Sequence, residues 1–437
     1  MSRRPGSGPP AGRPDGPLDA PSARRRYVLL TALRWFPTGL VAPVGVLLAQ
    51  DRGLSLSQIG AVVAVQGFVV FVLELPLGGL ADAAGRRPVL LLAGGVAVVS
   101  LVLLATADGA AGFAVAFAVQ GIWRALDSGP LEAWYVDTAQ TADPGVDITA
   151  GLGAGQTALN LGVGAGALAS GGVVALGRAL DGPTLALPIL LAVVLTVVST
   201  LAVAVLVRED RPGAPVPALR RGRAAVADVP AAVARGLGLL RSSRVLLALV
   251  SVELFWGFGM VSFESLMPLR LGEVLGSTDR AGVWMGPVTS AGWVAAALGA
   301  ALVPALARRT GPAPAAAALR VVQGVTVVGI GLLAGPLGVV AAFVACYTVH
   351  GASNPVHKVL LHRQATGGNR AVVLSLNSMV AQPAAAVGAL VLGAVADASS
   401  LSSALVVAAV VLALAAPLYL PAWRQGRDDP TPASGPA

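Results

Sequence analysis

Long apolar runs alternate with short polar breaks along this chain. The apolar runs reach about 20 residues or more, the length that a helix needs to cross a hydrocarbon core of ~30 Å. They are rich in Leu, Ala, Val and Gly and show no two-residue period, which favours helices over the strands of a barrel. The pattern predicts an all-α, polytopic membrane protein.

Twelve spans are expected, in two groups of six. Their expected ranges are 27–49, 57–80, 88–107, 111–136, 151–176, 184–207, 244–270, 281–306, 314–334, 337–357, 372–395 and 401–422. The longest break, 208–243, is rich in arginine and separates the sixth span from the seventh. The expected units are a disordered cytoplasmic tail, a six-helix bundle, a cytoplasmic linker, a second six-helix bundle and a second cytoplasmic tail: 1–26, 27–207, 208–243, 244–423 and 424–437.

Composition agrees with a membrane protein. Of the 437 residues, 55% are hydrophobic and 12% are charged, with a mean hydropathy of +0.77. A soluble chain carries about twice that charged fraction. One cysteine, Cys346, excludes an intrachain disulfide.

The basic residues predict the orientation, because Lys and Arg in short loops resist translocation. Placing the amino terminus in the cytoplasm puts most of the 30 basic residues in inner loops and tails. Four then face outward: Arg52, Arg178, Arg270 and Arg280. Inside spans we expect only Arg34 and Arg124. Inner-loop topology thus accounts for the net charge of +8, and we expect no nucleic-acid partner. The preference for Arg over Lys and for Ala and Gly suggests a bacterial plasma membrane.

The two groups of spans suggest an internal duplication, a device common in transporters. One constant shift lays Arg308 and Arg309 on Arg86 and Arg87, Leu302 on Leu80, and Gly282 on Gly60. We therefore expect two pseudo-symmetric six-helix bundles.

The polar break between spans two and three reads GGLADAAGRRP. Its residues Gly78, Asp82, Gly85, Arg86 and Arg87 resemble the cytoplasmic loop signature of the major facilitator superfamily. In that family the loop is a latch that breaks in the inward-facing state. The alternative is that the arginines only anchor topology.

The acid that receives the loop arginines in that family is similar in placement to Asp137, so Arg86–Asp137 is the expected gate pair. Glu74 lies one helical turn before the loop and is expected to join this network.

Span five is similar to the antiporter motif of the same family at Gly153, Gly162, Gly166 and Gly171. It departs from the motif at Ala167 and Ser170. The match implies an exporter that exchanges substrate for protons. The alternative is close helix packing, for which small residues at four-residue spacing are sufficient.

Charges inside spans are expensive and therefore candidates for function. Those proposed for proton coupling are Arg34, Arg124, Asp127, Glu132, Glu253 and Glu264. Arg124 resembles an arginine of the family's fourth span, and at i,i+3 it can pair with Asp127. A static ion pair is the alternative. Glu253 and Glu264 are about three turns apart, on similar faces of one helix, and a carboxylate of span four or seven is the expected partner of Arg34.

Aromatic and amide side chains within spans are candidates for lining a substrate cavity. They are Trp35, Gln66, Trp123, Gln156, Asn160, Trp256, Trp293, Asn377 and Gln382. No acid or cysteine cluster accompanies His350, His357 and His362, so no metal site is expected. His357 and His362 are instead assigned to a basic inner-loop edge with Lys358 and Arg363.

The sequence contains no GxxxxGK[ST], GxSxG or HExxH motif. We therefore expect neither an ATPase nor another enzyme, and no cofactor. The leading hypothesis is a monomeric secondary transporter in the lipid bilayer that exports small amphipathic molecules by proton antiport. Uptake of a small metabolite is the alternative, and a membrane enzyme or receptor is a more distant one.

Overall fold

The structure is a computed structural model that describes residues 18–182, 184–209, 234, 236–365 and 370–428. Within these residues it contains helices and no strands, and 12 helical stretches are long and apolar enough to cross a membrane. The predicted all-α class and the twelve spans are therefore confirmed.

The first half contains α1 (Ala20–Val41), α2 (Gly45–Asp51), α3 (Leu56–Ala84), α4 (Arg86–Thr106), α5 (Gly109–Leu126), α6 (Pro130–Ala142), α7 (Ile148–Ala179) and α8 (Leu187–Leu206). The second half contains α10 (Arg244–Val261), the π-helix η1 (Ser262–Leu266), α11 (Met267–Leu275), α12 (Thr278–Thr310), α13 (Pro312–Leu332), α14 (Gly335–Gln364), α15 (Arg370–Ala398), α16 (Leu401–Leu414), the 3₁₀ helix η2 (Ala416–Tyr419) and α17 (Leu420–Asp428).

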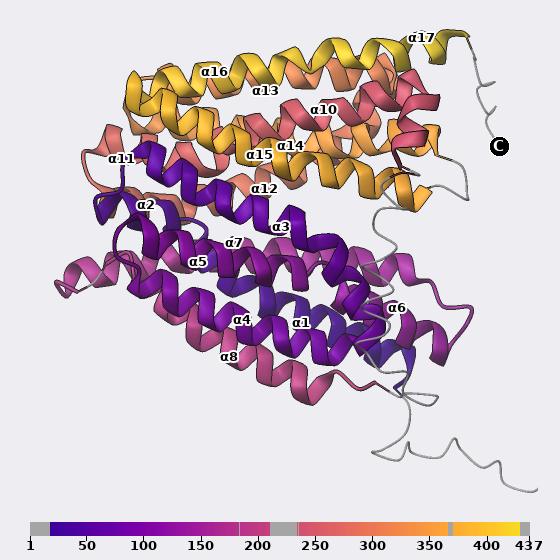
Figure 1. Ribbon diagram of the computed structural model, residues 1–437, viewed down its shortest axis with the longest axis horizontal. Coiled ribbons are helices and arrows are strands. Elements are labelled where there is room, and N and C mark those ends of the chain that lie inside the picture. The colour runs from indigo at the N-terminus through magenta and orange to yellow at the C-terminus, as the bar shows by residue number, and fades with distance from the viewer. Residues whose placement is uncertain (1–17, 183, 210–233, 235, 366–369, 429–437) are drawn as a thin grey trace, which may run out of the picture.

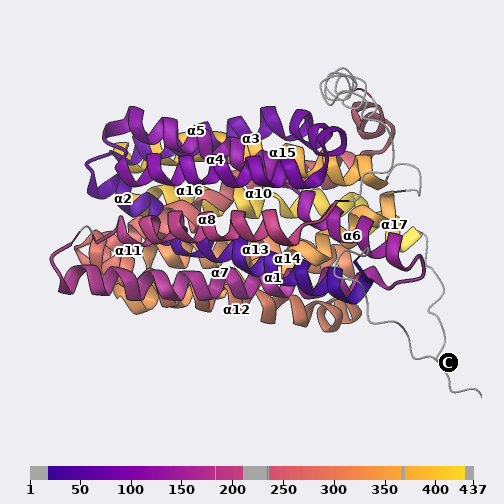
Figure 2. The same ribbon diagram turned by 90° about the horizontal axis from the view of Figure 1, so that it is seen from below.

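Each half forms its own bundle of six spans, and all spans run along one common axis (Figures 1 and 2). The described chain begins and ends at the same end of this axis, called here the terminal end (Figure 1). The other end, where α3 and α12 begin, is called the opposite end.

The two bundles meet along two equivalent seams, α3 against α15 and α7 against α12. Gly60 and Gly282, which the proposed duplication superimposes, lie one in each seam. A Cβ on Gly60 would be 2.2 Å from the carbonyl oxygen of Ala389 in α15, and one on Gly282 would be 3.2 Å from Val174 in α7. Both glycines thus permit close contact between the halves, as a pseudo-twofold relation requires.

The twin arginines depart from this symmetry. Arg86 and Arg87 open α4, whereas Arg308 and Arg309 lie in the last turn of α12. The reason is helix length, because α12 has 33 residues and α3 has 29. The same shift therefore matches the beginnings of these two helices and not their ends.

The first span begins earlier than expected. α1 starts at Ala20, capped by the Asp19 carboxylate, which accepts a hydrogen bond of 2.8 Å from the Ser22 backbone N–H. The expectation of a disordered tail through residue 26 is therefore wrong for Ala20 onward, and residues 1–17 lie outside the described part. At the other terminus α17 continues to Asp428, into the expected tail.

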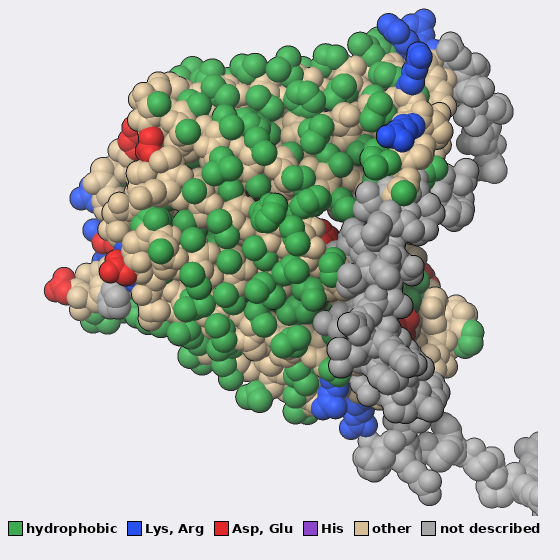
Figure 3. Space-filling view, viewed as in Figure 1, with side chains coloured by type: hydrophobic (Ala, Val, Ile, Leu, Met, Phe, Trp, Pro, Cys, Tyr) green, Lys and Arg blue, Asp and Glu red, His purple; other side chains and the backbone are tan. Residues whose placement is uncertain are grey.

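The outer surface of both bundles is apolar along most of their length (Figure 3). Leu161, Leu201 and Val205, for example, are 67%, 61% and 71% exposed. Such a band suits a hydrocarbon environment and would be unfavourable in water. Figure 3 also shows a hollow between the bundles near the terminal end, with acidic side chains beside it.

Two spans are interrupted within the membrane. Span four breaks between α5 and α6, and span seven contains the π-helix η1 between α10 and α11. Irregular backbone at membrane depth is tolerated where it is buried in protein or lines a water-filled cavity, and π-helical turns are frequent at functional sites. Both interruptions carry charged residues, and they define the candidate site.

Candidate functional site

The break in span four has a clear origin in the sequence. Asp127 leaves the helix with φ −90° and ψ 0°, and Gly129 has φ +104°, a conformation that favours glycine. Pro130 follows at the first turn of α6, where its missing N–H costs no hydrogen bond. Asp-Ser-Gly-Pro therefore stops one helix and starts the next.

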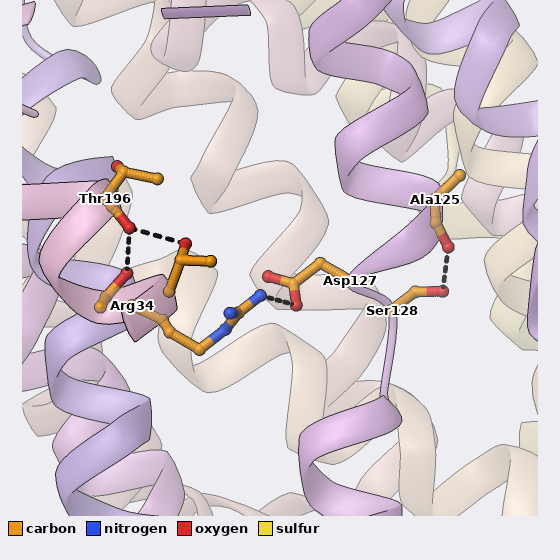
Figure 4. A network of polar contacts seen from close by, with 7 residues as sticks. Arg34, Ala125, Asp127, Ser128 and Thr196 are labelled. Atoms are coloured by element: carbon orange, nitrogen blue, oxygen red, sulfur yellow. Dashed lines mark hydrogen bonds and ion pairs between the residues drawn. The ribbon is translucent and has the colours of Figure 1, made fainter. Parts of the chain in front are cut away.

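The Asp127 carboxylate at this break accepts a hydrogen bond from the Arg34 guanidinium of α1 (Figure 4). The two side chains are 17% and 7% exposed. The structure thus brings Arg34 together with an acid of span four, one of the two spans expected to supply its partner. The expected local pair of Arg124 with Asp127 is not the one that forms, because Asp127 lies beyond the end of α5 and faces α1.

Arg124 instead interacts electrostatically with two glutamates, Glu74 of α3 and Glu264 of η1. By solvent accessibility Arg124 and Glu264 are both exposed. They belong to different halves, so the two charges face one solvent-accessible space between the bundles. Glu74, expected to join the loop network, is electrostatically coupled to Arg124 instead.

An aromatic cluster in the second half contacts Glu264 through Tyr347. The Tyr347 hydroxyl donates to the Glu264 carboxylate over 2.7 Å. The Tyr347 ring lies 5.9 Å from Phe263, 6.3 Å from Trp293 and 5.9 Å from His350.

Trp256 completes this cluster by stacking on His350 with ring centroids 5.8 Å apart. Trp256 and Trp293 were expected in the cavity, whereas Phe263, Tyr347 and His350 were missed. A usable signal was present, because Tyr347 and His350 share one face of a predicted span.

A second polar network is buried inside the second bundle. His357 of α14 lies 3.3 Å from the Glu253 carboxylate, 3.1 Å from the Asn377 side-chain oxygen and 3.0 Å from the Tyr419 hydroxyl. Glu253 is 6% exposed and His357 2%. The assignment of His357 to a basic inner-loop edge is wrong, since the residue is buried and α14 extends seven residues past it to Gln364.

Glu253 and Glu264 both contact α14, as their spacing suggests, but their surroundings differ. Glu253 is enclosed with His357, whereas Glu264 is exposed beside Tyr347. Asn377, expected in the substrate cavity, belongs to the enclosed network.

The expectation that Arg34 and Arg124 are the only cations within spans is also wrong. Arg320 of α13 is 0% exposed, and its charge acts on Glu253. One guanidinium nitrogen, Nη1, donates to Gln323 over 3.0 Å, while Nε and Nη2 have no hydrogen-bond partner among the described residues. The signal was available, because Arg320 lies well inside the expected span 314–334.

The loop between α3 and α4 has a well-defined set of contacts. An Arg86 guanidinium nitrogen lies 3.7 Å from the Asp137 carboxylate, so the expected pair is brought together. Glu209 accepts hydrogen bonds from the backbone N–H groups of Arg86 (2.5 Å) and Arg87 (3.4 Å) and so caps α4. Gly85 precedes them with φ +98°.

Arg86 and Asp137 belong to the same bundle, so this pair braces the loop and does not itself join the halves. Gly78 and Asp82 lie in the last turns of α3. Asp82 was expected to take part in the latch, and its side chain lies outside the described part of the structure.

The glycines of span five serve close helix contacts. A Cβ on Gly162 would lie 3.1 Å from a carbonyl oxygen of α1, and one on Gly166 would lie 2.2 Å from another. On Gly171 it would lie 2.7 Å from a carbonyl oxygen of α12, in the other half. Gly153 has open space around it.

The remaining cavity and coupling candidates have varied surroundings. Gln66 donates to Gln120 over 2.8 Å, and Gln156 donates to Asn160 over 3.1 Å. Trp123 packs on a small apolar cluster of α4 and α5. Trp35 is 36% exposed, and Gln382 is partly buried beside Gly67 of α3. Glu132 is exposed in the first turn of α6, where its charge acts on Tyr27.

Comparison with known proteins identifies the family. The sequence model of the Major Facilitator Superfamily matches residues 27–356. No curated protein matches this chain in sequence.

Three solved structures show the same fold. The nucleoside transporter NupG is 13% identical with a TM-score of 0.72, covering 92% of this chain and 99% of its own. A bacterial homologue of the human lysosomal transporter Spinster, inward-facing and unoccupied, is 14% identical with a TM-score of 0.71, covering 95% and 99%. A POT family transporter in complex with 5-aminolevulinic acid is 15% identical with a TM-score of 0.68, covering 92% and 96%. The twelve-span architecture and the family match together show that this chain is a transporter belonging to the Major Facilitator Superfamily.

Proposed function

We propose that this transporter exports small amphipathic molecules in exchange for protons, by alternating access across a bacterial plasma membrane. The terminal end is assigned to the cytoplasm. Exposed basic side chains gather at helix ends there, including Arg308, Arg309, Lys358 and Arg363. Basic residues at short loops favour the cytoplasmic side.

The observation that carries the proposal is the electrostatic pair of Arg124 and Glu264 across the space between the halves. A guanidinium near a carboxylate favours the ionised form of the acid. When the guanidinium moves away, the protonated form of the acid is favoured. Because the two residues belong to different bundles, a tilt of one bundle against the other changes their separation. Proton binding at Glu264 is thereby linked to which side of the membrane is open.

The Arg34–Asp127 pair adds a second titratable position. It joins α1 to the break after α5, so movement of α6 relative to α5 alters the same contact. Asp127 and Glu264 are therefore the assigned proton carriers. Glu253 is assigned a structural role, because its carboxylate is enclosed with His357.

The substrate class follows from the surroundings of Glu264. Aromatic rings offer apolar area and attract organic cations over their faces, while Arg124 and Glu264 offer charges to a polar group. A molecule with an apolar body and a polar or charged end fits such a lining. Trp256 and Trp293, which are partly exposed, are assigned to its apolar part, and the buried Tyr347 is assigned to holding Glu264.

Everted membrane vesicles, in which the cytoplasmic face points outward, test this function. A panel of fluorescent amphipathic dyes, cationic, neutral and anionic, is offered with and without a protonophore. We expect at least one dye to accumulate only while the interior is acidic. Glu264→Gln and Asp127→Asn should each lower that accumulation at least tenfold, whereas Glu132→Gln, an exposed acid of the same region, should change it less than twofold.

Dye accumulation that is unaffected by the protonophore would exclude proton antiport, and full coupling in both variants would exclude these two acids as carriers. Uptake of a small metabolite is the second candidate, because an interaction between bundles such as that of Arg124 with Glu264 can couple protons to movement in either direction. It predicts a solute that right-side-out vesicles accumulate under an inward proton gradient.

A further inference from the structure

The amino terminus of α3 is capped in two different ways. Ser55 and Gln58 form a reciprocal capping box, in which the Ser55 N–H donates to Gln58 Oε1 (2.9 Å) and the Gln58 N–H donates to Ser55 Oγ (3.3 Å). The two N–H groups between them, of Leu56 and Ser57, donate to Asp397 Oδ1 and Oδ2 over 3.0 and 2.9 Å. All four free donors of this helix end are thus satisfied, two of them by a carboxylate from the other half.

The position of Asp397 is unfavourable within its own helix. It is the penultimate residue of α15, and the carboxyl end of a helix carries partial negative charge. At the amino end of α3 the same carboxylate meets partial positive charge and two N–H donors. Its favourable interactions are therefore made across the seam between the bundles.

The seam is closed tightly around this contact. A Cβ on Gly393, one turn before Asp397, would lie 2.7 Å from the carbonyl oxygen of Leu56. Directly beside it is a surface pocket lined by both halves, including Asp51 and Leu56 of the first and Thr278 and Ser399 of the second. Separation of the bundles here would open this pocket inward.

We propose that Asp397 is a latch that holds the opposite end of the transporter closed in the inward-open state. The inference rests on the proposed alternating access and orientation, which make the opposite end the outer one. Opening the outer side withdraws the Asp397 carboxylate from α3, and the N–H groups of Leu56 and Ser57 must then be hydrogen-bonded by water. The latch therefore biases the transporter toward the inward-open state.

A weaker counterpart lies at the pseudo-symmetric position. The duplication superimposes Thr278 on Leu56, and Thr278 Oγ1 donates to Asp51 of the first half over 3.0 Å. Here the acid contacts a side-chain hydroxyl, while the backbone N–H of Arg280 is capped by Ser277 of the same half. Asp51 ends α2, which also contacts α12, and this single side-chain contact makes it the control for Asp397.

The test measures accessibility of the outer seam without any substrate. Val174 is fully buried against Gly282 between α7 and α12, so Val174→Cys reports separation of the bundles. The native Cys346 is 0% exposed and serves as the background. Intact cells are treated with a membrane-impermeant maleimide, and the labelling rate is followed in the Val174→Cys protein.

Adding Asp397→Ala, which removes both acceptor oxygens, should raise the labelling rate about fivefold, within the range that loss of a helix cap produces. Asp51→Ala should raise it less than twofold. Gln58→Ala weakens the cap of α3 locally while leaving Asp397 in place, and it should leave labelling unchanged. Monodispersity in detergent establishes that each variant is folded.

An unchanged labelling rate in Asp397→Ala would overturn the latch, and so would an equal increase in Gln58→Ala, which would assign the effect to helix stability. Labelling only in everted vesicles would refute the orientation instead. Absence of proton-driven export with the expected labelling would refute the proposed function and leave the latch in place.

Discussion

Loss of one partner of the Arg34–Asp127 pair is expected to destabilise the first bundle. Removing one member of a buried ion pair costs about 3–5 kcal/mol, because the other charge stays buried without compensation. The Asp127 side chain is 17% exposed, so water reaches it and the expected cost falls below that range. We expect Arg34→Met and Asp127→Leu each to lower the free energy of unfolding by about 2 kcal/mol.

The double variant is expected to be less damaged than the sum of the single ones. With both charges replaced by apolar groups, no buried charge lacks a partner, and the loss should be about 1 kcal/mol. The coupling energy between the two positions is then about 3 kcal/mol. Equilibrium unfolding in mixed micelles with a rising fraction of SDS, followed by tryptophan fluorescence, measures all four proteins.

A coupling energy below about 0.5 kcal/mol would refute this reasoning, since exposed ion pairs commonly have interaction energies of that size. Arg124→Met is the matched control. Arg124 is exposed and forms no direct ion pair among the described residues, so its loss should cost less than about 1 kcal/mol.

Two further predictions concern stability. Gly166→Val places a Cβ 2.2 Å from a backbone oxygen of α1 and should abolish folded protein, measured as the monodisperse fraction in detergent; Gly153→Ala, in open space, should leave that fraction unchanged. Arg320→Met removes a fully buried cation whose charge acts on Glu253, and it should lower the unfolding free energy by about 2–4 kcal/mol. If Arg320→Met unfolds like the unmodified protein, the enclosed network is not stabilising.

The parts of the fold that follow from composition were predictable. Lipid requires long apolar helices with internally satisfied backbone, so the number of spans could be counted from the chain. Gly60 and Gly282 could be related by a single shift because the second span of each half begins equivalently. The lengths of α3 and α12 could not be predicted in this way, since α12 runs four residues longer than α3 before it ends at Gly311.

The site was predictable by residue type and much less by partner. Asp127 was identified as a charge within a span, but a straight helix was assumed, which would pair it with Arg124. The Asp-Ser-Gly-Pro sequence that breaks the helix was the missed signal, and the true partner comes from α1. Arg320 was predictable as an intramembrane cation, because it lies well inside the expected span 314–334. The contacts of His357 come from three other segments, α10, α15 and η2, a convergence that no local spacing reveals.

The π-helical turn η1 gives span seven an adjustable register. A π turn holds about one residue more than an α turn, and regularising it to α geometry would rotate the following segment by about 100° relative to α10. Glu264 lies within this wide turn, and α11 follows directly. The carboxylate can therefore be swung about the helix axis by rewinding one turn, with no sliding of the whole span. The direction in which Glu264 points is thus determined by the geometry of one helical turn.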